Sequence, residues 1–277
     1  GTAPTPKAVP APQPQAFPEL GQVLAISSGK GGVGKSTVAA NLACELARSG
    51  KRVALMDADV YGPNIPRLFG VNEKPMVRNG MIVPLERYGV KLISLGLLVE
   101  RDMPAIWRGP IVNKIIQQFL ADVEWGKLEY LLVDLPPGTG DAQLSLAQSV
   151  RLRGAIIVTT PQEMAAGDAL RGAKMFERVG VPVLGVVENM SYFVCPHCGE
   201  KSDVFLEGGG SRLADELGVP LLGQIPLQAG MTGMADEGNP IVISDPGSPA
   251  GQALGAITRE LVAKAGGKSV SLPIVSS

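Results

Sequence analysis

A glycine-rich segment, residues 27–37 (SSGKGGVGKST), contains the side chains with the clearest chemistry in the sequence. Its glycines match the G-x-G-x-x-G spacing of dinucleotide-binding loops, and Asp57 follows at about the distance of an acidic residue that binds a ribose. The segment also matches G-x-x-x-x-G-K-S/T, in which backbone N–H groups surround phosphates, a lysine reaches the outer phosphates and a hydroxyl binds Mg²⁺. A dinucleotide fold has no use for Lys35 and Ser36, so we predict a nucleoside triphosphate site. The predicted phosphate-binding residues are Gly29, Lys30, Gly31, Gly32, Val33, Gly34, Lys35, Ser36 and Thr37.

Three aspartates end apolar runs and could support this site. The run YLLVD ends in Asp134, where a carboxylate would hold Mg²⁺ through water, and the turn at residues 136–140 could sense the γ-phosphate. Asp57 and Asp59 end the run RVALMDAD. The alternative role for each carboxylate is to cap the helix or turn that follows. The glycine-rich loop and Asp134 point independently to the same chemistry, which favours a Mg²⁺-nucleotide site.

A second candidate site is the pair Cys195 and Cys198 in the sequence CPHC. This knuckle spacing puts two thiolates on one metal ion or cluster. His197 is the only histidine, and Cys44 falls on a predicted helix, where we expect a small buried side chain. Spacing alone leaves zinc and an iron–sulfur cluster equally favoured, with a redox dithiol as a third option that Gly199 disfavours, because it indicates a turn. A set of four thiolates requires two chains, which a two-fold homodimer would supply.

Short apolar runs alternate with helical patterns along most of the chain. This order predicts an α/β fold, a doubly wound and mainly parallel sheet flanked by helices. The predicted strands are 23–27, 52–59, 91–95, 130–134, 155–159, 183–188 and 221–224. Helices are expected after the glycine-rich loop and from about Pro110, Asp141, Met164, Ser211 and Pro249.

The two ends of the chain differ from this pattern. Residues 1–20 are rich in proline and alanine with little charge, which predicts an extended linker or leader, and a linker implies an upstream domain. Residues 267–277 are expected to form a tail. The predicted organisation is therefore a single ATPase-type domain, residues 21–266, that carries the cysteine knuckle at 195–198.

The overall composition narrows the possible partners. Lys and Arg number 25 against 26 Asp and Glu, which predicts no general attraction to nucleic acid or to an anionic membrane. No apolar run approaches the roughly 18 residues that span a bilayer. With three cysteines and no disulfide framework, the sequence favours a reducing, cytoplasmic location.

Lys30, a second lysine inside the loop, makes the segment resemble the deviant Walker-A family of MinD and the nitrogenase iron protein. The resemblance implies that Lys30 crosses a dimer interface to the partner's nucleotide, whereas its alternative is a solvated charge. It further implies that Asp59 positions the attacking water, that Asp57 lies near Mg²⁺ and that the Asn189 amide contacts adenine. Asn189 is otherwise an ordinary turn former.

The span from Leu24 to about Ala265 resembles the Mrp/ApbC family of iron–sulfur carrier ATPases. Besides the loop, the shared motifs are DADVYGP at 57–63, WRGP at 107–110, DLPPGTGD at 134–141, ENMS at 188–191 and CPHC at 195–198. The resemblance implies an ATPase that uses ATP/ADP and Mg²⁺ and carries a labile 4Fe–4S cluster between the two chains of a homodimer. Its implied partners are apo iron–sulfur clients and cluster assembly factors.

Three other functions share these motifs in part. A MinD-like spatial organiser requires an amphipathic C-terminal helix or a basic surface, and here residues 257–264 form only a short pattern before an uncharged tail. A zinc-bridged regulatory ATPase dimer would use the same cysteines. A nitrogenase-type electron donor would use two well-separated cysteines per chain, which the adjacent pair does not match.

Overall fold

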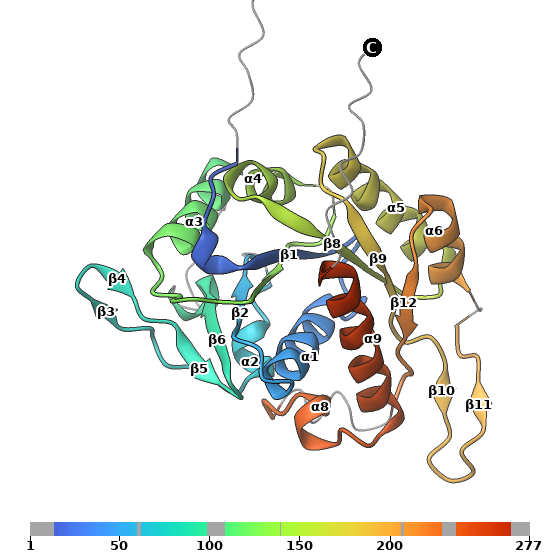
Figure 1. Ribbon diagram of the computed structural model, residues 1–277. Helices are drawn as coiled ribbons and strands as arrows, with labels where there is room; N and C mark the ends of the chain where they lie inside the picture. The colour runs from blue at the N-terminus through green and yellow to red at the C-terminus, as the bar shows by residue number, and fades with distance from the viewer. Residues whose placement is uncertain are drawn as a thin grey trace, which may run out of the picture.

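Seven parallel strands form the centre of the described part of the protein. The computed structural model describes residues 14–59, 62–98, 109–138, 140–205, 208–228 and 237–266. The strand order is β12-β9-β8-β1-β7-β2-β6-β5, with β5 antiparallel to β6 (Figure 1). The strands are β1 Gln22–Ser28, β2 Val53–Asp57, β5 Leu85–Arg87, β6 Val90–Ser94, β7 Tyr130–Asp134, β8 Leu152–Thr159, β9 Val183–Glu188 and β12 Leu221–Gln224.

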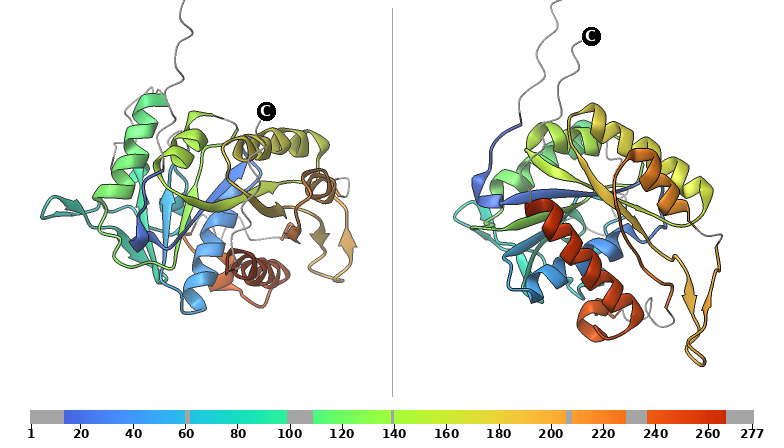
Figure 2. Two further views of the ribbon diagram at one scale, coloured as in Figure 1. Left: turned by 45° about the horizontal axis from the view of Figure 1, so that its top comes forward. Right: turned by 45° about the vertical axis from the view of Figure 1, so that its right-hand side comes forward.

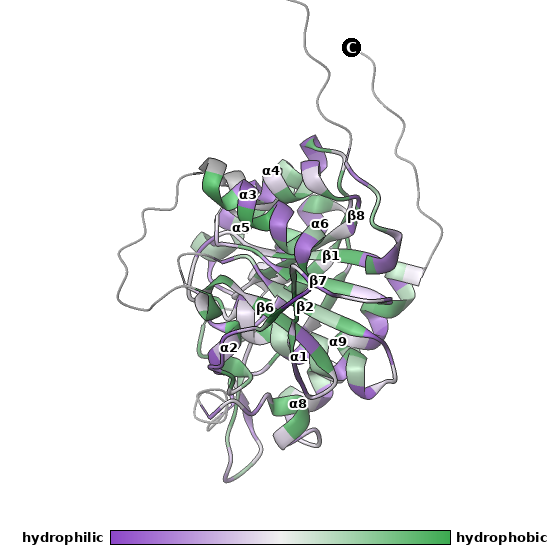
Figure 3. Ribbon diagram, turned by 90° about the vertical axis from the view of Figure 1, so that its left-hand side faces the viewer, coloured by the Kyte–Doolittle hydropathy of each residue, from purple (hydrophilic) through white to green (hydrophobic). Residues whose placement is uncertain are grey.

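Helices cover both faces of this sheet, as Figures 1 and 2 show. One face carries α3 Gly109–Asp122, α4 Asp141–Ser149, α5 Glu163–Arg178 and α6 Gly209–Leu217. The other carries α1 Lys35–Arg48, α2 Ile65–Leu68, α8 Ile241–Ser244 and α9 Pro249–Gly266. On each face, buried apolar side chains of the strands and helices form a separate cluster. The central strands are largely hydrophobic along their length (Figure 3). Burial on both faces explains why these strands read as continuous apolar runs.

Several short elements lie outside the central sheet and the helices that cover it. The 3₁₀ turns η1 and η2 cover Pro18–Leu20 and Leu95–Leu97. Two antiparallel hairpins, β3 Val77–Arg78 with β4 Met81–Ile82 and β10 Phe193–Val194 with β11 Lys201–Ser202, project from opposite sides of the molecule (Figure 1). None of the helices described is long and apolar enough to cross a membrane.

The predicted fold class is confirmed, and β7, β9 and β12 have the predicted bounds. The other predicted strands differ at their ends by one to three residues, with β8 beginning at Leu152, and α6 begins at Gly209. The domain's packing also starts earlier than residue 21, because Leu20 is fully buried and Phe17 packs against the same cluster. Residues 1–13 of the expected leader and the expected tail 267–277 lie outside the described residues. The short elements were not predicted, because two to four residues show no periodicity.

Candidate nucleotide site and cysteine turn

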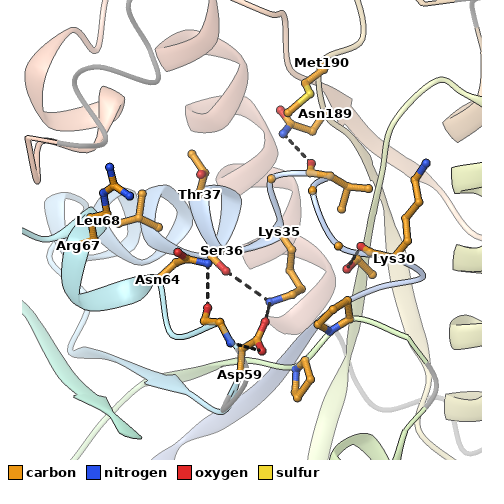
Figure 4. A pocket seen from close by; sticks show the side chains of 18 of the residues that line it. Lys30, Lys35, Ser36, Thr37, Asp59, Asn64, Arg67, Leu68, Asn189 and Met190 are labelled. Carbon is orange, nitrogen blue, oxygen red and sulfur yellow. Dashed lines mark hydrogen bonds and ion pairs between the residues drawn. The ribbon is translucent and has the colours of Figure 1, made fainter. Parts of the chain in front are cut away.

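The glycine-rich loop joins the end of β1 to the start of α1, at the carboxyl edge of the parallel strands. Ligands in open α/β sheets bind at this edge. A cavity of about 950 Å³ opens there, and its wall includes the whole of residues 30–37 (Figure 4). Asp59, Arg67, Gln143 and residues that follow β9 and β12 also line it. All of the predicted loop residues except Gly29 thus line one cavity of suitable size for a nucleotide.

Lys35 and Ser36 meet on the Asp134 carboxylate. Lys35 Nζ lies 2.6 Å from Asp134 Oδ1, and Ser36 Oγ donates to Asp134 Oδ2 over 2.6 Å. Lys35 and Asp134 are almost fully buried, with 6% and 0% of their side chains exposed. Hydroxyl and carboxylate oxygens are the ligands that Mg²⁺ prefers, and a cation held by Ser36 Oγ would have Asp134 within reach through water. The donor set therefore fits the predicted Mg²⁺ site.

The two aspartates near the end of β2, Asp57 and Asp59, differ in their surroundings. Asp59 lines the cavity, with Oδ2 3.7 Å from Lys35 Nζ and Oδ1 accepting from the Gly62 N–H (Figure 4). Asp57 accepts from Ser94 Oγ over 2.9 Å and from the Asp59 N–H over 3.1 Å. Asp57 lies beside Asp134 in the sheet and is not part of the cavity wall. Its carboxyl thus holds the loop after β2, and a role near Mg²⁺ remains a proposal.

Burial and the neighbouring Asp134 carboxylate raise the pKa of Asp57 to about 8. The folded protein therefore binds a proton that the unfolded chain releases near pH 4, and its stability falls as the pH rises between these values. We expect the free energy of unfolding to lose up to about 1.4 kcal/mol per pH unit through Asp57. Denaturant titrations between about pH 5 and pH 8 should show Asp57→Asn gaining stability relative to the parent as pH rises. A pH-independent difference would contradict this assignment.

Asn189, at the end of β9, touches the glycine-rich loop. Its Nδ2 donates to the Val33 carbonyl over 2.9 Å, and Met190 beside it lines the cavity. The Gly34 backbone passes so close that a Cβ there would lie 2.2 Å from Asn189 Nδ2. A loop backbone this near the strand end requires glycine. Asn189 is therefore placed where its amide can meet a base bound beside the loop.

Gly34→Ala should destabilise the protein, because Gly34 has a φ of +80° in addition to that clash. A left-handed conformation costs an L-residue roughly 1–2 kcal/mol, before any displacement of Asn189. Gly31→Ala is the matched control, since only a Pro137 carbon at 4.0 Å approaches its Cβ position. Thermal unfolding should show a lower Tm for Gly34→Ala than for Gly31→Ala; equal Tm values would disprove the close approach.

Lys30 lies on the same loop with a partly exposed side chain that lines the cavity. Figure 4 shows it pointing away from Lys35. Its carbonyl accepts from Ser28 Oγ, and the ammonium group makes no ion pair with any residue in the described ranges. The charge is thus available at the rim of the site.

Gln143 on α4 is a site residue that the sequence did not reveal. Its Nε2 donates to the carbonyls of Pro136 and Gly138, over 3.0 and 2.8 Å. These bonds fix the amide orientation, because a flipped amide would set its oxygen against two carbonyls. Gln143 thus holds the turn after β7, and a glutamine inside a helical pattern carries no signal of that role. Thr139 of this turn lies outside the described residues, as do Val60, Tyr61, Trp107 and Arg108.

Cys195 and Cys198 lie in a tight turn between β10 and β11. The Cys195 N–H donates to the Glu200 carbonyl and the Gly199 N–H to the Cys195 carbonyl, each over 2.9 Å. Gly199 has a φ of +73°, as a residue leaving a tight turn requires. The predicted turn is confirmed, and no helix starts at this C-x-x-C.

The turn favours a thiolate at Cys195. The backbone N–H groups of Cys198 and then His197 point at its sulfur and hold the pKa of the Cys195 thiol below its ordinary value. Cys198 is exposed, whereas Cys44 is buried and burial raises the pKa of its thiol to about 12. Over the described ranges of the chain, no group of three or more His, Cys, Asp and Glu side chains could hold a metal ion. One copy therefore offers two sulfur ligands at this turn.

Comparisons with known proteins identify relatives along most of the chain. A family model described as ParA, NUBPL iron-transfer P-loop NTPase, matches residues 19–262. An iron-sulfur cluster carrier protein of Synechocystis sp. is 50% identical over 269 residues, 95% of this chain and 76% of that protein. The iron-sulfur cluster transfer protein NUBPL of Mus musculus is 47% identical over 244 residues, 87% of this chain and 76% of that protein.

Solved structures show the same fold. A nucleotide-binding protein from Archaeoglobus fulgidus, in complex with ADP, is 42% identical with a TM-score of 0.70, over 79% of this chain and 87% of that one. The cell division ATPase MinD of Pyrococcus furiosus superposes with a TM-score of 0.67 at 24% identity, over 87% of this chain and 98% of that one. This likeness concerns the fold alone. Because the family model matches residues 19–262 and the relatives are about 50% identical in sequence, the chain belongs to the ParA family of NUBPL-type iron-transfer P-loop NTPases.

Proposed function

We propose that this protein is a Mg²⁺-dependent ATPase that carries a labile 4Fe–4S cluster and transfers it to apo-proteins in the cytoplasm. In this proposal the ATPase domain comprises residues 21–266 together with residues 17–20, which pack against its core, with a linker before it and a tail at residues 267–277. The observation that carries the proposal is the exposed turn with Cys195 and Cys198 on a P-loop domain. Two thiolates in an accessible turn suit cargo that must be taken up and handed on.

The nucleotide site would act through the residues assembled at the loop. Backbone N–H groups of residues 29–37 hold the phosphates, with Lys35 on the outer phosphates. Ser36 and Asp134 would hold Mg²⁺, partly through water and with Asp57 nearby, and the ion would neutralise charge on the phosphates. Asp59 orients the water that attacks the γ-phosphorus as the bond to ADP breaks. Asn189 reads the adenine edge.

Lys30 would complete the site in the partner subunit. We expect Lys30→Ala to keep its affinity for ATP but to lose on the order of a thousandfold in turnover, as loss of a cation supplied in trans does. Titration with ATP and phosphate-release kinetics measure the two effects separately. Lys174→Ala, on the exposed face of α5, is the control and should retain parental turnover. Equal turnover in Lys30→Ala and the parent would rule out the role in trans.

The homodimer follows from the count of ligands. A 4Fe–4S cluster takes four thiolates, whereas the described part of one chain offers two accessible cysteines. A two-fold axis beside the turn would bring Cys195 and Cys198 of both subunits together. Apo iron–sulfur proteins and cluster assembly factors are then the partners, and nucleic acid and membranes are not.

Two alternatives remain distinguishable from this proposal. A zinc-bridged regulatory dimer would use the same four thiolates, so the identity of the metal decides between them. A MinD-like organiser needs an exposed apolar helix face. Here α9 begins at Pro249, as predicted, and its residues Leu254, Ile257 and Leu261 are buried in the core. That burial leaves this face unavailable to a membrane.

Anaerobic reconstitution tests the proposal. The purified chain is incubated with iron and sulfide, and bound metal, visible absorbance and molar mass are measured together. We expect about two irons per chain, a 4Fe–4S spectrum and a dimer. Zinc bound in preference to iron, or a cluster held by a monomer in every nucleotide state, would refute the carrier proposal.

A further inference from the structure

Glu188, the last residue of β9, is a fully buried carboxyl group that the nucleotide chemistry does not use. Three donors converge on it. Ser191 Oγ donates to Oε1 over 2.6 Å, Gln224 Nε2 donates to Oε1 over 2.8 Å, and the Gly210 N–H donates to Oε2 over 2.5 Å. A buried carboxyl group with both oxygens satisfied holds its donors in one arrangement. Glu188 therefore ties together three separate segments of the chain.

The three segments come from different parts of the fold. Gln224 ends the edge strand β12, and Gly210 lies in the first turn of α6, where the helix dipole favours an acceptor. A Cβ on Gly210 would lie 2.7 Å from the Glu188 Cβ, so glycine is required for this approach. Ser191 begins the path to the cysteine turn. Glu188 thus anchors that path to a strand and a helix of the core.

The same path starts at the nucleotide cavity. Asn189, which follows Glu188, donates to the Val33 carbonyl of the phosphate loop. Met190 lines the cavity and has a φ of +55°, in the left-handed region that a residue with a side chain enters only when its neighbours hold it there. Ser191 is held at two points, since its N–H donates to the Ile225 carbonyl and its hydroxyl to Glu188. Residues 189–191 thus form a turn that is hydrogen-bonded at both ends and whose first residue contacts the phosphate loop.

A second connection runs from the cavity to the base of the cysteine hairpin. Pro226, Leu227 and Gln228 line the cavity. The Leu227 N–H donates to the Tyr192 carbonyl over 2.7 Å, and Leu227 pairs with Phe193 as a parallel bridge. Phe193 opens β10, which leads within two residues to Cys195. The backbone that enters the hairpin, at Tyr192 and Phe193, is therefore paired with a segment that lines the nucleotide cavity.

We propose that Glu188 is a positioning residue that transmits nucleotide occupancy from the Asn189 side of the cavity to the turn that holds Cys195 and Cys198. By locking Ser191 onto α6 and β12, Glu188 makes residues 189–191 move as one body. A displacement at Asn189 is then passed to Tyr192 and Phe193 instead of being absorbed by bond rotations between them. This inference rests on the proposed function, because it assigns how that nucleotide site and that metal site are coupled.

The test measures thiol reactivity in the full-length protein without iron. Alkylation of Cys195 and Cys198 by iodoacetamide is followed by peptide mass spectrometry at constant pH, with and without saturating Mg²⁺-ADP. In the parent we expect ADP to change the alkylation rate by about fivefold. In Ser191→Ala and Glu188→Gln the ratio of the two rates should fall to about one, while calorimetry gives an ADP affinity within about threefold of the parent.

Matched variants separate loss of the proposed coupling between the nucleotide site and the cysteine turn from a general loss of structural stability. Ser149→Ala removes another buried hydroxyl, which donates to the Ser145 carbonyl over 2.7 Å, and should keep the full response. Ser191→Thr retains a hydroxyl and should restore it. If Ser191→Ala and Glu188→Gln keep the parental response to ADP, or if the parent shows none, the inference is overturned whatever the iron content of the reconstituted protein. A chain that loads iron and binds ADP without any change at the cysteines thus refutes the coupling and leaves the carrier proposal standing.

Discussion

Lys35→Ala is expected to weaken the binding of ADP and ATP by about a hundredfold, the largest effect of any substitution in the loop. The side chain starts α1 and is directed at the carboxyl edge of the sheet, where its ammonium group lies between Asp134 and Asp59. A charge-assisted contact to phosphate from a buried position loses little to solvent screening, which is why its removal costs more than loss of an exposed lysine. Isothermal calorimetry with Mg²⁺-ADP measures the effect.

The same substitution should also lower stability, because it leaves two buried carboxylates without their cation. Breaking a buried ion pair from one side costs about 3–5 kcal/mol. Denaturant unfolding of Lys35→Ala and of Lys35→Met, which keeps most of the side-chain volume, separates lost affinity from lost fold. Lys51→Ala removes an exposed partner of Glu129 and is the matched control, with little change expected in either property. ADP affinity within about threefold of the parent in folded Lys35→Met would contradict the assignment.

Cys195→Ser and Cys198→Ser are each expected to abolish retention of the cluster after anaerobic reconstitution. Each substitution in a homodimer removes two of the four proposed ligands at once, so the remaining pair cannot hold a 4Fe–4S cluster. The effect should be close to complete loss of bound iron and of visible absorbance, with ADP affinity unchanged. Iron and sulfide analysis with the absorption spectrum provides the measurement.

Cys44→Ser is the control for these variants, because Cys44 is the remaining cysteine and lies buried in α1. It should load iron like the parent, although a hydroxyl in an apolar site lowers stability by about 1–3 kcal/mol. Iron content that is the same in Cys195→Ser, Cys198→Ser and Cys44→Ser would show that the turn is not the cluster site. Loss of iron in Cys44→Ser alone would indicate that the metal binds in the core and not at the turn, and it would refute the proposal.

The fold and the phosphate loop could be predicted in detail because their signals are local. Strands buried on both faces appear as unbroken apolar runs such as YLLVD, and the loop needs glycine, lysine and hydroxyl residues at fixed spacing. The turn at Cys195 could be predicted for the same reason, since Gly199 supplies the left-handed conformation a few residues away. The antiparallel strand β5 and the helices α2 and α8 escaped prediction, because elements of three or four residues are too short to show a hydrophobic period.

Chemistry and topology class were thus already present in the residue types and their order: a P-loop, three carboxylates at strand ends and one cysteine pair. Only the folded chain decided how these parts meet. Three sets of contacts show this: Asn189 approaches Gly34, Gln143 donates to the turn after β7, and Ser191, Gly210 and Gln224 converge on Glu188. They join residues 3 to 155 positions apart, with no repeating pattern. Such contacts depend on how strands and helices pack in three dimensions, and packing leaves no periodic trace along the chain.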